Sequence, residues 1–205
     1  MCILFLKKTL IVLFVMLFFA CLNSKAFAAD YSANTRDPVI YSAITLTKTM
    51  NDSVVKVLAG ENSTHQTIFV QFANLSELSY EYMNADAVTV IGEDGRMKIY
   101  IDKSLANSPP EAIACLLEHE TTHNDSISSI EEEVVAWTKE ATAWSYFTQK
   151  KPALANLDET KYPLVDRLNY LSGLYKQSGR TSSAIRQEIL SNGVYTNLAL
   201  HSEGF

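Results

Sequence analysis

The chain has 205 residues, of which 47% are hydrophobic and 20% are charged, and its formal net charge at pH 7 is −6. This mixture is typical of one globular domain and excludes a low-complexity or collagen-like chain. The negative charge also argues against nucleic acid and anionic lipid headgroups as partners, because both are negatively charged themselves.

The first 28 residues have the pattern of a secretory signal peptide. Lys7 and Lys8 precede an apolar run over residues 10–20, and Ala26-Phe27-Ala28 places small residues where signal peptidase cleaves. The apolar run is shorter than the ~20 residues that a membrane-spanning helix needs. We therefore expect cleavage after Ala28 and no stable membrane insertion afterwards.

Cleavage would leave a mature domain of residues 29–205 that is secreted, periplasmic or extracellular. It would keep 14 of the 17 basic residues against 23 acidic ones, a net charge of −9. Cys2 and Cys21 would leave with the signal peptide, and lipid attachment at Cys21 is a weaker alternative. Only Cys115 would remain, so no intramolecular disulfide is expected.

The sequence pattern up to residue 101 predicts helices followed by strands. Apolar residues at helical spacing favour one or two helices over residues 40–59, broken near Asn51-Asp52. Residues 67–72 are rich in β-branched and aromatic side chains and predict a strand.

A β-hairpin is predicted from residues 87–91 and 97–101, which flank a turn segment containing two glycines. In its second strand Met97, Ile99 and Ile101 alternate with polar or aromatic residues, so we expect one buried face.

The following helix carries the main functional motif. Ser108 is expected to cap it, with Pro109 in its first position and Glu111 completing a capping box. If it continues through His119-Glu120-Thr121-Thr122-His123, both imidazoles leave one face and can bind one metal ion. Neutral imidazoles are good zinc ligands, and a neighbouring carboxylate can take a proton from water. This HExxH pattern therefore predicts a zinc site, the alternative being two histidines that are only surface groups.

A catalytic zinc ion needs a third protein ligand. The next helix, predicted over residues 130–147 and capped by Ser128 or Ser129, carries Glu131-Glu132-Glu133 in its first turn. Carboxylates are favoured there by the helix dipole, so the run could also be a solvated face. We favour Glu133 as the ligand because a small residue, Ala136, one turn later allows close helix approach, and Glu132 is the alternative.

Two other candidate ligands are less suitable. Cys115 lies eight residues before His123, roughly 12 Å along a helix, so it is expected in the core. His201 is a remote candidate near the C-terminus. Further helices are predicted near residues 164–177 and 182–190.

Over residues 83–137 the chain resembles the gluzincin-type zinc metallopeptidases, which share HExxH and a downstream Glu with thermolysin. The resemblance implies that His119, His123 and Glu133 bind Zn²⁺ and that Glu120 is the general base and acid. Residues 84–88 are similar to the edge strand that pairs with an extended peptide in several such enzymes. The residues then expected to contact substrate are Asn84, Ala85 and Ala87.

No motif marks the residue that would stabilise an oxyanion. By residue type alone the candidates are Tyr162, Tyr170, Tyr175 and His201.

Together these patterns predict an α+β, zincin-like fold, in which a small β-sheet packs on the HExxH helix and a mostly helical C-terminal part follows. The predicted function is that of an exported zinc metallopeptidase acting on a peptide or protein substrate. The alternatives are a non-catalytic secreted module containing zinc, or a zinc hydrolase of a non-peptide amide such as a cell-wall component.

Overall fold

The computed structural model describes residues 30–61, 66–93, 95–123 and 128–202, and the compact unit Tyr31–Phe205 contains nearly all of them. The predicted signal peptide and its cleavage site lie outside the described residues. Among the helices that are described, none is both long and apolar enough to cross a membrane.

Two helices precede the sheet and meet at the predicted break. Helix α2 spans Pro38–Met50 and begins at Asp37, whose carboxylate accepts hydrogen bonds from the first backbone N–H groups of the helix. Helix α3 spans Ser53–Leu58. The apolar face of α2, including Ile40 and Ile44, is fully buried.

The sheet has three strands in the order β1-β3-β2, with β1 parallel and β2 antiparallel to β3. The strands are β1 Phe69–Ala73, β2 Ala87–Ile91 and β3 Met97–Asp102, and the short helices α4 Leu75–Leu78 and η1 Tyr80–Tyr82 lie between β1 and β2. The predicted hairpin is confirmed, and Met97, Ile99 and Ile101 form its buried face. Strand β2 is therefore an edge strand.

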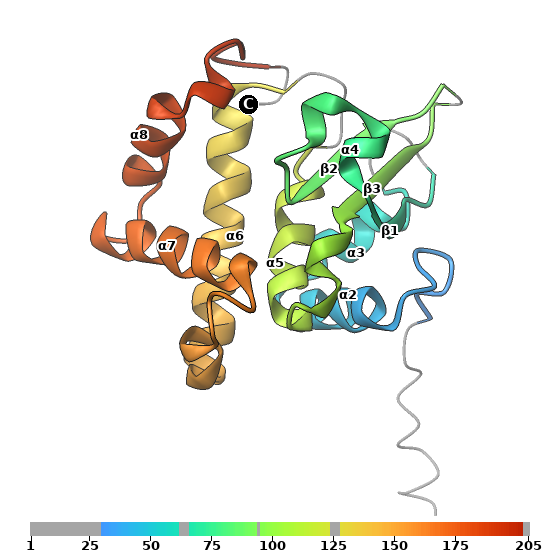
Figure 1. Ribbon diagram of the computed structural model, residues 1–205, viewed down its shortest axis with the longest axis horizontal. Coiled ribbons are helices and arrows are strands. Elements are labelled where there is room, and N and C mark those ends of the chain that lie inside the picture. The colour runs from blue at the N-terminus through green and yellow to red at the C-terminus, as the bar shows by residue number, and fades with distance from the viewer. Residues whose placement is uncertain (1–29, 62–65, 94, 124–127, 203–205) are drawn as a thin grey trace, which may run out of the picture. The chain divides into compact units, whose positions relative to one another are not determined.

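Helix α5, Pro110–Glu120, lies between the sheet and the C-terminal helices (Figure 1) and packs against α2. The predicted capping box is wrong. The helix starts one residue later than expected, with Pro109 at the cap position and no side-chain cap. Ser108 instead ends the short helix η2, Lys103–Asn107, and Glu111 pairs with Lys151.

The expectation that all of HExxH is helical is also wrong, because α5 ends at Glu120. The hydroxyls of Thr121 and Thr122 donate to the carbonyls one turn earlier, at 2.6 and 3.0 Å. The N–H of His123 donates to the carbonyl of Glu120, three residues back, so a tighter turn carries the second histidine.

The C-terminal part is mostly helical, as predicted. It comprises α6 Ile130–Lys150, η3 Pro152–Asn156, α7 Pro163–Gln177, α8 Ser183–Ser191 and η4 Gly193–Tyr195. Ser129 caps α6, since its hydroxyl accepts a hydrogen bond from the N–H of Glu132. Buried apolar residues of α6 pack with Leu171 of α7 and with Ile185 and Ile189 of α8.

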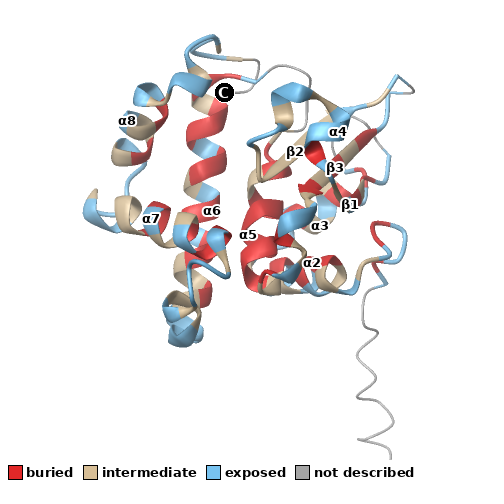
Figure 2. Cartoon of the chain, viewed as in Figure 1, coloured by how far each residue is buried: buried red, intermediate tan, exposed pale blue. Residues whose placement is uncertain are grey.

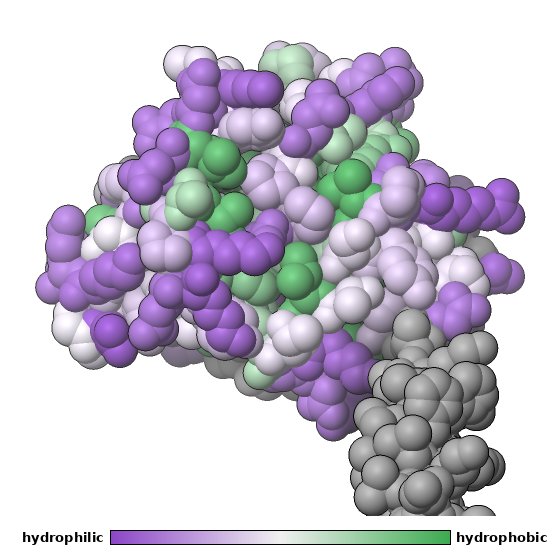
Figure 3. Space-filling view, turned by 90° about the horizontal axis from the view of Figure 1, so that it is seen from below, coloured by the Kyte–Doolittle hydropathy of each residue, from purple (hydrophilic) through white to green (hydrophobic). Residues whose placement is uncertain are grey.

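Burial concentrates on α5 and on one side of α6 (Figure 2), so the helix that carries HExxH lies in the centre of the unit. On the face seen in Figure 3, hydrophilic side chains separate several small hydrophobic patches. The predicted fold class is confirmed as α+β, with a small mixed sheet packed with helices.

Candidate metal site

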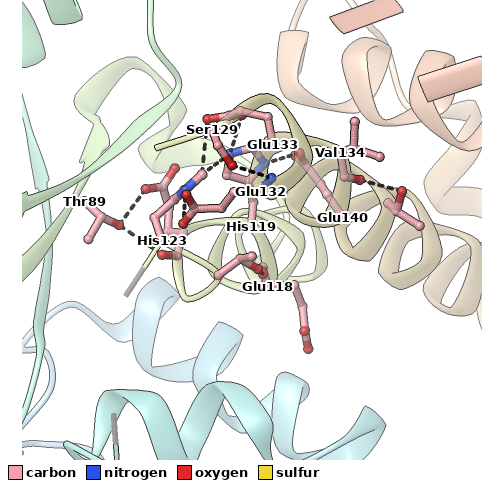
Figure 4. Close-up of polar contacts among 12 residues, drawn as sticks. Thr89, Glu118, His119, His123, Ser129, Glu132, Glu133, Val134 and Glu140 are labelled. Atoms are coloured by element: carbon pink, nitrogen blue, oxygen red, sulfur yellow. Dashed lines mark hydrogen bonds and ion pairs between the residues drawn. The ribbon is translucent and has the colours of Figure 1, made fainter. Parts of the chain in front are cut away.

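His119, His123 and Glu133 come together as a cluster that could hold a metal ion. His119 lies in the last turn of α5, His123 in the turn that follows, and Glu133 in the first turn of α6 (Figure 4). Ligand atoms of all three lie within 4.8 Å of one another. The start of α6 therefore supplies a third possible ligand, Glu133, which faces the two histidines and lies outside the HExxH motif.

The spacing of the three ligands fits a small tetrahedral ion. The two Nε2 atoms of His119 and His123 are 3.2 Å apart, and they lie 3.8 and 3.5 Å from oxygens of Glu133. Two ligands bound at 2.0–2.1 Å with a tetrahedral angle would be about 3.4 Å apart.

A buried carboxylate lies next to the Nδ1 atom of each histidine. Nδ1 of His119 lies 3.2 Å from Oε2 of Glu140, and Nδ1 of His123 lies 3.1 Å from Oε1 of Glu132. A carboxylate accepts the Nδ1 proton of a neutral imidazole and so leaves the Nε2 lone pair for a metal ion. The contact of Glu140 with His119 is a hydrogen bond and favours this tautomer, whereas Nδ1 of His123 makes an ion-pair contact with Glu132 and has no hydrogen-bond partner among the described residues.

The two Nε2 atoms and the carboxylate of Glu133 face one another at the centre of the cluster, and each can offer a lone pair to a metal ion. Oε2 of Glu133 is buried and has no hydrogen-bond partner among the described residues. Burial raises the pKa of Glu133. Burial lowers the pKa of His123, but Glu132 and Glu133 outweigh it and raise that pKa to about 9. This set of acceptors lacks a cation. In the metal-free protein, a proton on His123 supplies the positive charge instead.

Glu120 is held beside the cluster from the sheet side. The hydroxyl of Thr89, on β2, lies 2.8 Å from Oε2 of Glu120 and 3.1 Å from its backbone carbonyl oxygen. Glu120 is only 4% exposed, yet it lines a cleft of about 450 Å³ together with the three cluster residues. Strand β2 forms one wall of this cleft, and Tyr195 lies in its lining as well.

The wall formed by β2 has backbone groups available for pairing. The N–H of Asp102 donates to the carbonyl of Asp86, and the N–H of Gly92 donates to that of Arg96, both at 2.8 Å. In an antiparallel ladder such pairs recur at every second residue. Ala87, Thr89 and Ile91 therefore turn their N–H and C=O groups away from β3.

The predicted substrate-contacting residues are placed only in part at the cleft. Ala87 lies in its lining, whereas Asn84 is exposed in the turn before β2, and neither Asn84 nor Ala85 lines the cleft. Val88, Thr89 and Val90, in the middle of β2, line the cleft together with Ala87.

The three glutamates at the start of α6 have different partners. Glu133 joins the histidine cluster, Glu132 backs His123, and Glu131 pairs with Arg186 of α8. Cys115 is fully buried, as expected. Glu140 lies seven residues, or two helical turns, after Glu133 on the buried side of α6, and this spacing was the available sequence signal for it, which the sequence reasoning missed.

The four residues proposed to stabilise an oxyanion do not line the cleft, and His201 is exposed. Tyr195 of η4 does line it, with its ring packed edge-on against Trp137 at 5.9 Å. Burial, followed by the charge of Glu133, raises the pKa of Tyr195, so its hydroxyl keeps its proton and can donate a hydrogen bond. No sequence motif surrounds this residue.

Comparison of the chain with protein-family models, with curated proteins and with solved structures gave no match.

Proposed function

We propose that the protein is an exported zinc-dependent peptidase. The observation that supports this best is the position of Glu120, a buried carboxylate held next to the His119, His123 and Glu133 cluster and lining the same cleft. A site that only stored a structural ion would not need this extra carboxylate at an open cleft, since structural zinc sites are closed by their ligands.

Two nitrogens and one carboxylate leave a tetrahedral ion with an open position, which is typical of catalytic zinc. When bound, zinc would supply a Lewis acid that polarises a carbonyl group and lowers the pKa of water. Glu120 would take the proton from the attacking water and pass it to the leaving amine. The hydrogen bond from Thr89 keeps the carboxylate of Glu120 oriented for both transfers.

We expect an extended peptide in the cleft because no strand among the described residues pairs with the outer edge of β2. The N–H and C=O groups of Ala87, Thr89 and Ile91 can form main-chain hydrogen bonds to a substrate strand. Thr89 lies in the middle of this edge and also contacts Glu120, so the scissile bond would lie next to the general base. The hydroxyl of Tyr195 would donate a hydrogen bond to the developing oxyanion.

The test compares wild type with Glu120→Gln on peptide libraries and on cell-wall fragments, with zinc content measured in parallel. We expect cleavage of peptides, loss of turnover in Glu120→Gln and unchanged zinc. The exposed Glu159→Gln serves as a control and should behave like wild type. Cleavage of cell-wall amides alone would favour the non-peptide hydrolase. Zinc binding with no turnover of either substrate class would favour the binding module and overturn the proposal.

A further inference from the structure

An ion-pair network leads from the metal-site histidine to the start of the cleft strand. It consists of His119 on α5, Glu140 on α6, Arg167 on α7 and Asp86 just before β2. Nδ1 of His119 lies 3.2 Å from Glu140, Nη2 of Arg167 contacts the other oxygen of Glu140, and Nε of Arg167 lies 2.7 Å from Oδ2 of Asp86.

Both ends of this network are fixed to functional parts of the molecule. Asp86 belongs to the sheet ladder, because its carbonyl accepts the N–H of Asp102 at 2.8 Å. The next residue, Ala87, is the first of the three whose backbone groups face the cleft. Glu140 has no exposed surface and contacts both Arg167 and His119. A shift of Arg167 would therefore change the positions of both Asp86, at the start of the strand, and Glu140, which contacts the metal-site histidine.

The choice of arginine fits this arrangement. A guanidinium group is planar and presents its N–H donors in a fixed fork, so it can hold two carboxylates in a set geometry. Here Nη2 donates a hydrogen bond to Glu140, whereas Nε lies 2.7 Å from Asp86 as an ion pair and has no hydrogen-bond partner among the described residues. A lysine would keep the charge but not the fixed geometry between the two carboxylates.

We propose that Arg167 is a positioning residue that sets the peptide-binding edge of β2 and the orientation of His119 relative to each other. Its effect on the metal ion passes through Glu140, and its effect on β2 passes through Asp86. The part that concerns peptide binding rests on the proposed function, whereas the link between Asp86 and metal affinity does not.

The test is a double-mutant cycle on zinc affinity, measured by competition with a chromophoric chelator. We expect Arg167→Met to weaken zinc binding about 10- to 100-fold, the range for residues that orient a metal ligand. Asp86→Asn, which does not touch the cluster, should weaken it by a smaller factor. In the double variant Asp86→Asn should add much less than it does alone, because its contact with Arg167 is already broken and only its direct charge interaction with His119 remains.

Arg186→Met is the matched control, since Arg186 also joins a C-terminal helix to a glutamate of α6, but Glu131 contacts neither histidine. It should leave zinc affinity unchanged. If Arg167→Met does not fold, the cycle is run with Arg167→Lys, which should give a smaller loss of the same pattern. Wild-type affinity in Asp86→Asn, or independent effects that multiply in the double variant, would overturn the proposal.

The peptide part has its own readouts. Hydrogen exchange of the β2 amides should be faster in Asp86→Asn and in Arg167→Met than in Arg186→Met. With a cleaved peptide, KM should rise in Asp86→Asn at full zinc loading. If wild type cleaves nothing, the proposed function fails, while the zinc-affinity cycle still decides whether Arg167 links the two ends.

Discussion

The hydroxyl of Thr89 lies 2.8 Å from Oε2 of Glu120, which joins the edge strand β2 to the last turn of α5. The two residues are 31 positions apart in the sequence, and nothing in the HExxH pattern indicates this partner. The contact places the proposed general base directly against the strand that would hold the substrate.

Replacing Thr89 by valine removes the hydroxyl but keeps the shape of the side chain. A hydrogen bond to a charged group contributes ~1.5–3 kcal/mol, and each 1.4 kcal/mol corresponds to a factor of ten. We expect Thr89→Val to lower kcat about 10- to 100-fold with zinc retained. Thr45→Val, an exposed position on α2, is the control. Equal kcat values in steady-state assays of the two variants would show that this hydrogen bond does not orient Glu120.

Tyr195→Phe tests the proposed oxyanion donor. Removal of one such donor typically lowers kcat by about 10²- to 10³-fold, because the hydrogen bond strengthens as charge develops. KM and zinc content should change little. Tyr170→Phe, at a half-exposed tyrosine of α7 outside the cleft lining, should retain full activity. A wild-type kcat for Tyr195→Phe would remove this residue from the mechanism.

The metal-free protein should hold a proton on His123 over most of the physiological pH range. Burial opposes that proton, but Glu132 and Glu133 hold the pKa of His123 at about 9 instead of 6.5. Zinc needs the neutral imidazole, so zinc binding at pH 7 should release this proton, and affinity should rise with pH up to about 9. Calorimetry in buffers of different ionisation enthalpy measures the release. Zinc binding without proton release would contradict the assignment.

The same shift predicts a pH-dependent stability of the metal-free protein. A raised folded-state pKa contributes stability that is fully present below about pH 6.5 and is lost as the pH rises through about 9. The free energy of unfolding should therefore fall by roughly 3 kcal/mol between these values, and the fall should be smaller in His123→Gln. Urea titrations at pH 6 and pH 9 measure the free energy of unfolding of the wild type and of His123→Gln.

The helices behind the site depend on a shared apolar cluster. Ile185 of α8 is fully buried in it, so Ile185→Ala should lower the free energy of unfolding by about 2–5 kcal/mol. Leu190, five residues further on, is 54% exposed, and Leu190→Ala should lower the free energy of unfolding far less. Urea denaturation of both variants makes the comparison. Equal midpoints would mean that α8 does not pack on α6 as described.

Local patterns predicted most of the secondary structure. The alternation of Met97, Ile99 and Ile101 placed β3 and its buried face, and Ser129 was among the expected caps of α6. The end of α5 was missed because the N–H groups of Thr122 and His123 bond carbonyls three residues back instead of four, a change that the spacing of the motif does not indicate.

The spacing of residues in the sequence predicted the three residues of the candidate metal site. His119 and His123 are four residues apart, so any helix-like turn brings them together, and Glu133 required only a returning helix. Tyr195 and Arg167 reach the site or its neighbours from the C-terminal helices, through packing that no single stretch of sequence encodes. Their roles needed the tertiary arrangement.

The most direct test is the metal content of the chain from residue 29 onward, measured by elemental analysis in wild type, Glu133→Ala and Glu132→Ala. We predict one zinc ion per chain in wild type, severe loss of zinc in Glu133→Ala, and weaker binding with partial retention in Glu132→Ala, because Glu132 only backs His123. No zinc in wild type after reconstitution, or full zinc in Glu133→Ala, would contradict the three-ligand site.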